Sequence, residues 1–314
     1  MRSWKPAAIV NPRAGRDRAA GYWRSERARL EARFGRIEVR QTLCPGHASE
    51  LARELRGAGY DLLLVAGGDG TLNEVANGLL SGGASARDIT LAPLAAGNCS
   101  DLARALGPGV AVRLIDAVRA GCRDARGAPC ERWFVNMASF GLGAEVVRRG
   151  GGRGRAGYLL AAAATLAGFH AVPVRLTLDG VVVETSAVHV AVGNGISQGG
   201  GMRVCPRALL DDGLLDVTVI GDAGLADLVA NLRLIYSGRI YEHPKVRHFR
   251  AALLRAEAET GLELDGDPVG FLPAEFRVER GALSILGNVP SVPTFPGKVN
   301  VGTDGTFPGL RLAH

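Results

Sequence analysis

A glycine-rich turn follows a continuous apolar run in this 314-residue chain and restricts the folds open to it. The run from Asp61 to Ala66 has strand length and is typical of a strand buried on both faces of a sheet. It stops at Gly67-Gly68-Asp69-Gly70-Thr71, where Thr71, with Glu74 three residues later, predicts a capped helix through Leu80. Glycines at such a turn let backbone N–H groups approach phosphate oxygens, and the helix N-terminus favours negative charge. The turn therefore predicts a phosphate site.

Three side chains of this turn suit a triphosphate. Asp69 would orient it through water or magnesium, and Thr71 and Asn73 would donate hydrogen bonds to phosphate. No Gly-Lys-Ser/Thr follows, so the turn is not a Walker loop. A plain glycine turn between strand and helix is the alternative interpretation, and it does not account for the Asp, Thr and Asn.

The first 125 residues alternate strand and helix patterns. Short apolar runs at Ala7 to Val10, Ile37 to Gln41 and Ile89 to Leu94 alternate with helical stretches and flank the run that ends at Ala66. Repeated strand-loop-helix units of this kind predict a parallel, Rossmann-like sheet with ligands at the carboxyl ends of its strands. We expect residues 1–125 to form an α/β nucleotide-binding domain.

The pattern changes after about Cys122. Most later apolar runs are short and strand-like, and Asp179-Gly180 between two of them is a hairpin turn signal. Helical patterns are limited to about Tyr158 to Phe169 and Ala223 to Ile235. We expect residues 126–289 to form a mainly antiparallel β-sandwich domain, and the Pro- and Gly-rich tail 290–314 to pack back on the first domain.

Composition excludes several classes of protein. The chain is 47% hydrophobic and 22% charged, which is typical of a globular protein rather than a disordered one. Its five cysteines form no C-x-x-C pair, so neither a zinc site nor a disulfide framework is expected. The apolar run Ala156 to Phe169 is shorter than the roughly 20 residues that span a bilayer. We expect a cytoplasmic protein with peripheral contact on the inner face of the membrane.

Five stretches in order resemble the diacylglycerol kinase catalytic-domain superfamily, which includes bacterial lipid kinases and sphingosine kinases. The first two are Ile9-Val10-Asn11-Pro12 with Gly15, and the run Gly-Gly-Asp-Gly-Thr-Leu-Asn-Glu-Val that begins at Gly67. Phe134 to Gly141, Gly200 to Val217 and Glu263 to Asp267 follow. The resemblance covers roughly residues 7 to 287 and implies a two-domain kinase that uses ATP and Mg²⁺ to phosphorylate a lipid hydroxyl, with a role in lipid metabolism.

The resemblance also implies a set of site residues. Magnesium would be held by the Asp212 carboxylate with the carbonyls of Leu209 and Leu214. Asp265 or Asp267 would be the base for the acceptor hydroxyl, and the choice between them stays open. The expected nucleotide contacts are Asn11, Pro12, Arg13, Gly15, Thr42, Gly67, Gly68, Asp69, Gly70, Thr71, Asn73, Gly97 and Asn98.

The chain departs from the family pattern at two places. Asn98 stands where the family usually has threonine, and the late motif ends in Asp267 rather than glutamate. For Asp212 and for the Asp265/Asp267 pair, a simple turn is the alternative interpretation, since Asp-Gly is a common turn pair.

The acceptor and two rival functions complete the expectations. Arg148 to Arg155 precedes an apolar helical stretch, and basic loops beside apolar surface attract anionic headgroups, although a solvated loop beside a core helix is the plainer alternative. We expect a lipid substrate presented at a membrane surface, no nucleic acid, and a homodimer through an exposed sheet edge. The rivals are an NAD kinase-like soluble nucleotide kinase and a non-catalytic nucleotide-binding regulator.

Overall fold

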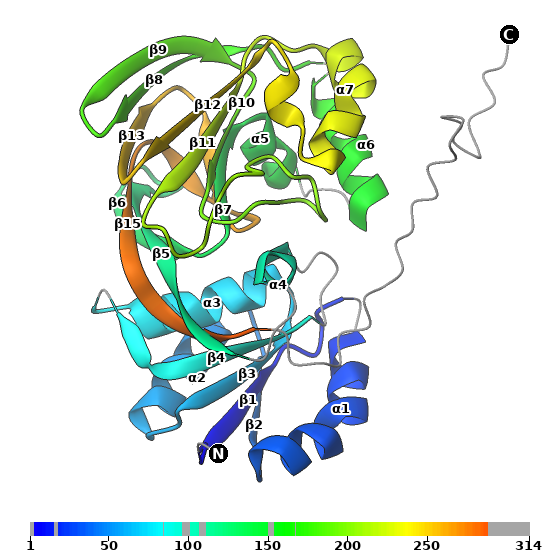
Figure 1. The fold of residues 1–314 in the computed structure, drawn as a ribbon, viewed down its shortest axis with the longest axis vertical. Coiled ribbons are helices and arrows are strands. Elements are labelled where there is room, and N and C mark those ends of the chain that lie inside the picture. The colour runs from blue at the N-terminus through cyan, green and yellow to red at the C-terminus, as the bar shows by residue number, and fades with distance from the viewer. Residues whose placement is uncertain are drawn as a thin grey trace, which may run out of the picture.

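The computed structural model describes residues 3–15, 18–83, 85–95, 101–106, 111–149, 154–166 and 168–287. The described chain forms two lobes that lie one above the other in Figure 1. The expected contacts Gly97 and Asn98 and the tail 290–314 lie outside the described residues.

The first lobe is built on a parallel sheet in the order β2-β1-β3-β4-β15. Its strands are β1 (Pro6–Val10), β2 (Glu38–Gln41), β3 (Leu62–Gly67), β4 (Ala86–Ala95) and the end of β15 (Asp267–Leu286). Its helices are α1 (Arg18–Phe34), α2 (His47–Gly57), α3 (Asp69–Leu80) and α4 (Asp101–Leu106). The predicted parallel α/β lobe is confirmed.

Strand β3 of this sheet is apolar at every position because both faces of the sheet are covered. In β3, Leu62 and Leu64 pack with α1, whereas Leu63 and Val65 pack with α2 and α3. Successive strand side chains point to opposite faces, so a sheet covered on both faces needs apolar residues at every position.

The second lobe is mainly antiparallel, as predicted. One run of strands is β12 (Val246–Ala251), β11 (Leu215–Ile220), β10 (His189–Gly193), β7 (Met137–Gly141) and β14 (Gly261–Leu264). The others are β5 (Val112–Arg123), β6 (Pro129–Phe134), β8 (Val172–Leu178), β9 (Val181–Ala187) and β13 (Leu253–Glu257). Their apolar faces enclose a separate core centred on Phe134, Phe140 and Phe276.

The lobe's helical elements are α5 (Leu142–Arg148), α6 (Gly154–Leu166), α7 (Leu225–Ser237) and the short 3₁₀ helix η1 (Ile240–Glu242). The two predicted helices correspond to α6 and α7, and α5 and η1 are additions. Among the described residues, no helix is long and apolar enough to span a bilayer.

Strand β15 joins the two lobes. It begins beside β14, runs antiparallel to β5 and ends parallel to β4, which makes it the long orange strand of Figure 1. Its last residues, Ala282, Leu283 and Ile285, are buried in the first lobe's core. The sequence predicts only a short strand here (Ala274 to Val278), because the pattern breaks at the bulge between Glu279 and Leu283.

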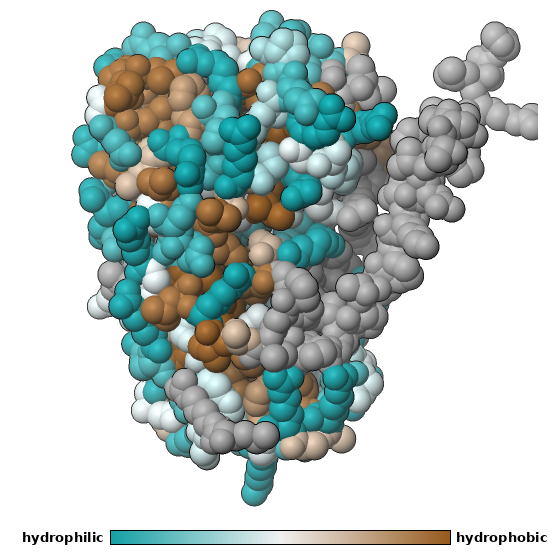
Figure 2. All heavy atoms as spheres, in the orientation of Figure 1, coloured by the Kyte–Doolittle hydropathy of each residue, from teal (hydrophilic) through white to brown (hydrophobic). Residues whose placement is uncertain are grey.

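One sheet edge bears on the predicted homodimer. Strand β9 pairs only with β8, so its other edge has no strand partner in the part of the chain that the structure describes. Val181 and Val182 of this strand are exposed, and apolar atoms gather at the upper left of Figure 2, where β8 and β9 lie. The homodimer stays a prediction.

Candidate functional site

The strand-turn-helix unit is tighter than the sequence predicts. Strand β3 ends at Gly67, Gly68 is the N-cap, and α3 begins at Asp69. The prediction that Thr71 caps the helix is wrong, because the glycines let the helix start three residues earlier. The Thr71 hydroxyl instead accepts a hydrogen bond from Asn11 Nδ2 at 2.9 Å. The first N–H groups of α3 are left without helical partners, as in any helix, and are available to an anion.

Gly67 is required by the packing of Thr71. A Cβ added at Gly67 would lie 2.6 Å from both Cβ and Oγ1 of Thr71. Any side chain here would push the threonine away from Asn11, so this glycine brings the loop after β1 against the N-terminus of α3.

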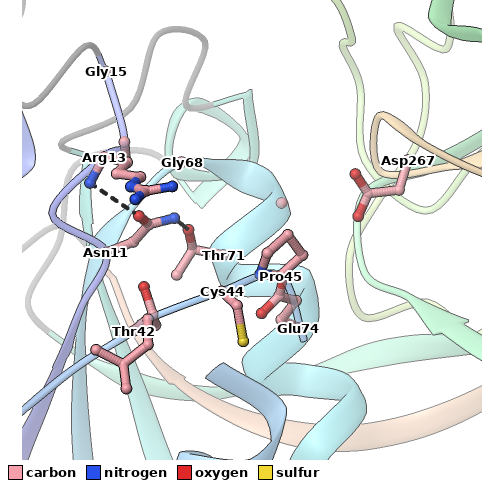
Figure 3. A pocket seen from close by; sticks show the side chains of 13 residues that line it. Asn11, Arg13, Gly15, Thr42, Cys44, Pro45, Gly68, Thr71, Glu74 and Asp267 are labelled. Carbon is pink, nitrogen blue, oxygen red and sulfur yellow. Dashed lines mark hydrogen bonds between the residues drawn. The ribbon is translucent and has the colours of Figure 1, made fainter. Parts of the chain in front are cut away.

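These loops line a cavity of about 450 Å³. Of the residues that the sequence singles out, Asn11, Arg13, Gly15, Thr42, Gly68, Gly70, Thr71 and Asp267 line it (Figure 3). Ala14, Leu43, Cys44, Pro45 and Glu74 also line it and are absent from the sequence-based set. The expected contacts Pro12, Gly67, Asp69 and Asn73 do not line it. The cavity thus joins the loop after β1, the loop after β2 and the start of α3.

Asp69 is turned away from this cavity. Its carboxylate accepts the backbone N–H groups of Asp101 at 3.0 Å and Leu102 at 3.3 Å, at the start of α4. Burial, together with the nearby Asp101 carboxylate, raises the pKa of Asp69 to about 6. Asp101 in turn accepts Ser197 Oγ at 3.0 Å and Gly200 N–H at 2.8 Å from the second lobe. Asp69 and Asp101 therefore connect the glycine turn to the facing lobe.

Asp265 is also held by the protein, through four hydrogen bonds to its carboxylate. It accepts the backbone N–H groups of Val135, Asn136 and Met137 at 2.9, 3.1 and 2.7 Å, and Asn73 Nδ2 at 2.8 Å. Its φ of +48° and that of Gly266, +89°, form the turn between β14 and β15. Asp265 thus lies in a turn and also connects α3 to the second lobe. Asn73 of α3 makes this connection by donating a hydrogen bond to Asp265.

Asp267, two residues later, faces the cavity. It lies across from Asn11 and Thr71 in Figure 3, and a Cβ added at Gly70 would lie 4.0 Å from its Oδ1. No described residue donates a hydrogen bond to the Asp267 carboxylate. Burial, then the charges of Asp265 and Glu74, raise the pKa of Asp267, and Arg132 opposes the shift. Of the two acids that the sequence left open, this one is placed to meet a ligand.

A buried acid supports the turn that carries Asp267. Glu263 accepts Ser139 Oγ at 2.6 Å and Gly266 N–H at 2.8 Å. Burial raises the pKa of Glu263 to about 7. The sequence did not single out Glu263, because its role depends on a strand pairing with β7 across more than 120 residues.

The segment 209–214, expected to bind magnesium, is contacted by Arg250 and Arg280. One Asp212 carboxylate oxygen contacts Arg250 Nη2, and the other accepts the Leu214 N–H at 3.0 Å. The carbonyl oxygen of Asp212 accepts Arg280 Nη2 at 2.7 Å. Leu209 is 55% exposed. Within the described ranges, no group of three or more His, Cys, Asp or Glu side chains could hold a metal ion. As arranged, the Asp212 carboxylate is paired with an arginine and does not fit a divalent ion.

Comparisons with known proteins agree with this architecture. Residues 5–125 match the family described as the diacylglycerol kinase catalytic domain, and residues 138–287 match the YegS C-terminal NAD kinase beta sandwich-like domain. The chain is 34% identical over 264 residues to a probable lipid kinase YegS-like protein of Pseudomonas aeruginosa, covering 79% of this chain and 84% of that protein.

Solved structures give the same result. The crystal structure of a candidate diacylglycerol kinase from Bacillus anthracis has a TM-score of 0.72 and 26% identity, covering 92% of this chain and 99% of that one. Yeast NADH kinase, at a TM-score of 0.50 and 11% identity over 100% of this chain and 91% of that chain, shares the fold alone.

Proposed function

Because the chain belongs to the diacylglycerol kinase catalytic-domain family, among its YegS-like lipid kinases, we propose that it transfers the γ-phosphate of ATP to a lipid hydroxyl. One observation carries the proposal: Asp267 of the second lobe lies on the wall of the cavity that Gly68, Gly70 and Thr71 of the first lobe also line. A phosphate cradle and a carboxylate beside it are what phosphoryl transfer to an alcohol requires.

The triphosphate would lie along the start of α3. Gly68 and Gly70 expose backbone that a phosphate can approach, and the helix N-terminus favours its charge. Arg13, positioned by the hydrogen bond from its N–H to Asn11 Oδ1 at 3.1 Å, adds a cationic side chain to the same wall. The nucleoside would extend toward Thr42 and the adjacent apolar wall of Leu43 to Pro45.

Asp267 would act as the general base. The acceptor oxygen attacks the γ-phosphorus, the bond from that phosphorus to the bridging oxygen of ADP breaks, and the acceptor proton passes to Asp267. A pKa raised by burial and neighbouring carboxylates makes Asp267 a stronger base than a free aspartate. Glu74, which also lines the cavity, contributes to this raised pKa, and the charge of Arg132 opposes it.

Magnesium would arrive as part of the MgATP substrate, where it neutralises charge on the β- and γ-phosphates. We assign no step of the reaction to an ion at residues 209–214.

The lipid would be met at a membrane surface, with the protein cytoplasmic and peripheral. Leu160 of α6 is 72% exposed, and the basic segment that begins at Arg148 precedes this helix in the sequence. An exposed leucine on a helix that follows an arginine-rich segment suits an anionic membrane. Arg148 and Arg149 both pair with Glu145, at 2.7 and 2.6 Å, which reduces the free charge of this face. Nucleic acid is not part of the proposal.

The test is radiolabelled ATP with a total lipid extract in vesicles, followed by identification of the labelled species, with NAD and NADH in parallel reactions. We expect labelled lipid, and Asp267→Asn to reduce the rate about 10²- to 10⁴-fold. Asp88→Asn, a change of an exposed first-lobe carboxylate that pairs with Arg56, is the matched control and should leave the rate unchanged. Phosphorylation of NAD or NADH without any labelled lipid would overturn the proposal.

A further inference from the structure

The turn between the two lobes at Asp212-Gly213 is held by hydrogen bonds and an ion pair within the protein. Besides the contacts of the Asp212 carboxylate and carbonyl, the N–H of Gly213 is donated to Asp116 Oδ2 at 2.7 Å. Asp116 is buried, and its other oxygen accepts the N–H of Gly281 at 2.7 Å. The turn is therefore fixed to β5 and β15 without any outside ligand.

Arg250 is held in place independently of Asp212. It lies opposite Asp216 in the pairing of β11 with β12, and its Nε is 3.3 Å from Asp216 Oδ2. Asp216 is fully buried, and its other oxygen lies 2.6 Å from His248 Nε2. The His248 ring stacks on Tyr241 with centroids 4.4 Å apart. This arrangement holds the Arg250 guanidinium between two carboxylates, so its contact with Asp212 is a built feature rather than that of a mobile surface side chain.

Arg280 covers the other side of the turn. Its Nη2 binds the Asp212 carbonyl, and a Cβ added at Gly213 would lie 1.8 Å from its Nε. Gly213 has a φ of +75°, so glycine is favoured here both by backbone conformation and by the arginine that lies against it. Two guanidinium groups thus contact the residue that would have to ligate a divalent ion, and both would repel one.

We propose that the Arg250 guanidinium is the permanent counter-cation of Asp212, in the position where a divalent ion would otherwise bind, and that the 209–214 segment keeps its conformation without metal. Magnesium then binds this protein only together with the nucleotide. The proposal concerns the protein alone and can be tested without ATP or lipid, so its failure is distinguishable from failure of the kinase assignment.

The experiment is a titration of the full chain with Mn²⁺, a paramagnetic substitute for Mg²⁺, in the absence of nucleotide, following free Mn²⁺ by electron paramagnetic resonance. We expect the parent protein to show no saturable site up to about 1 mM Mn²⁺. Arg250→Met, which keeps side-chain length but removes the charge, should bind one ion with a Kd on the order of 10⁻⁴ M. Adding Asp212→Asn to Arg250→Met should abolish that binding.

The matched control is Arg255→Met, because Arg255 also pairs with a carboxylate on a neighbouring strand, Glu275 at 2.7 Å, away from the turn. It should behave like the parent protein. Thermal unfolding with and without Mg²⁺ gives a second readout: only Arg250→Met should be stabilised by the ion. Saturable binding by the parent that Asp212→Asn removes would overturn the proposal, as would a folded Arg250→Met protein that gains no affinity.

Discussion

Removal of the Asp265 side chain should unfold the junction between the lobes rather than affect the chemistry directly. Asp265→Ala leaves four buried N–H groups without an acceptor: the three consecutive backbone N–H groups from Val135 to Met137, and one N–H of the Asn73 amide, whose nitrogen also donates to the Trp133 carbonyl. Each bond joins segments that are more than 120 residues apart in sequence, so no local structure replaces them. The turn between β14 and β15 would lose its attachment to α3.

The size of the effect follows from these four bonds. A buried donor left unsatisfied costs about 1–3 kcal/mol, and water entering the vacated space brings each toward the lower end. Four donors at about 1 kcal/mol each give a loss near 4 kcal/mol. Desolvation of the Asp265 carboxylate, which raises its pKa, is a cost that the variant no longer carries, and this offsets part of the lost stability. We therefore expect a decrease of about 3–4 kcal/mol in the free energy of unfolding.

The assay is urea unfolding followed by tryptophan fluorescence and far-UV circular dichroism. Trp133 is a local reporter, because its carbonyl accepts the Asn73 amide at 2.9 Å. Coincident transitions from the two probes would justify a two-state analysis. The matched variant is Asp267→Asn, which should stay within about 0.5 kcal/mol of the parent while losing turnover. An Asp265→Ala protein as stable as the parent but inactive would refute the assignment of the two acids.

Three further changes test the loops, the packing and the pH response. Asn11→Ala removes the hydrogen bond between the loop after β1 and the start of α3, and it should weaken MgATP binding about five- to tenfold in equilibrium dialysis. An unchanged Kd would exclude a role of this bond in nucleotide binding. Gly78→Ala places a Cβ 2.3 Å from the Ser49 carbonyl oxygen and should cost about 3 kcal/mol in thermal unfolding, whereas Gly21→Ala, with open space around it, should cost nothing. The pKa of Glu263 is raised from 4.5 to about 7, so its contribution to stability is complete below about pH 4.5 and is lost as pH rises to about 7. Glu263→Gln should therefore lessen the fall in unfolding free energy between pH 5 and 8 by about 2–3 kcal/mol, and parallel pH profiles would contradict this.

The fold could be predicted from the sequence because the patterns that specify its strands and turns lie within short segments. Buried parallel strands such as β3 are apolar throughout, and a hairpin needs a turn such as Asp179-Gly180, whose φ values of +46° and +91° the structure shows. The pattern failed where tertiary contacts override it. Strand β15 continues through a bulge, because Asp116 accepts the N–H of Gly281 and the strand can then pair with β4.

The glycine turn from Gly67 to Thr71 and the late acids also pointed to residues of the cavity wall, namely Gly68, Gly70, Thr71 and Asp267, because each motif is a short run whose chemistry depends on nearest neighbours. That the cavity binds phosphate stays a prediction. The sequence could not distinguish Asp265 from Asp267, two residues apart. The turn directs the Asp265 carboxylate toward backbone N–H donors and places Asp267 on the cavity wall. Nor could it show that Arg250 contacts Asp212, since only the pairing of β11 with β12 brings them together. The motifs by themselves determined which chemical groups are present, whereas the folded chain decided which of those groups are already bound to protein and which can bind a ligand.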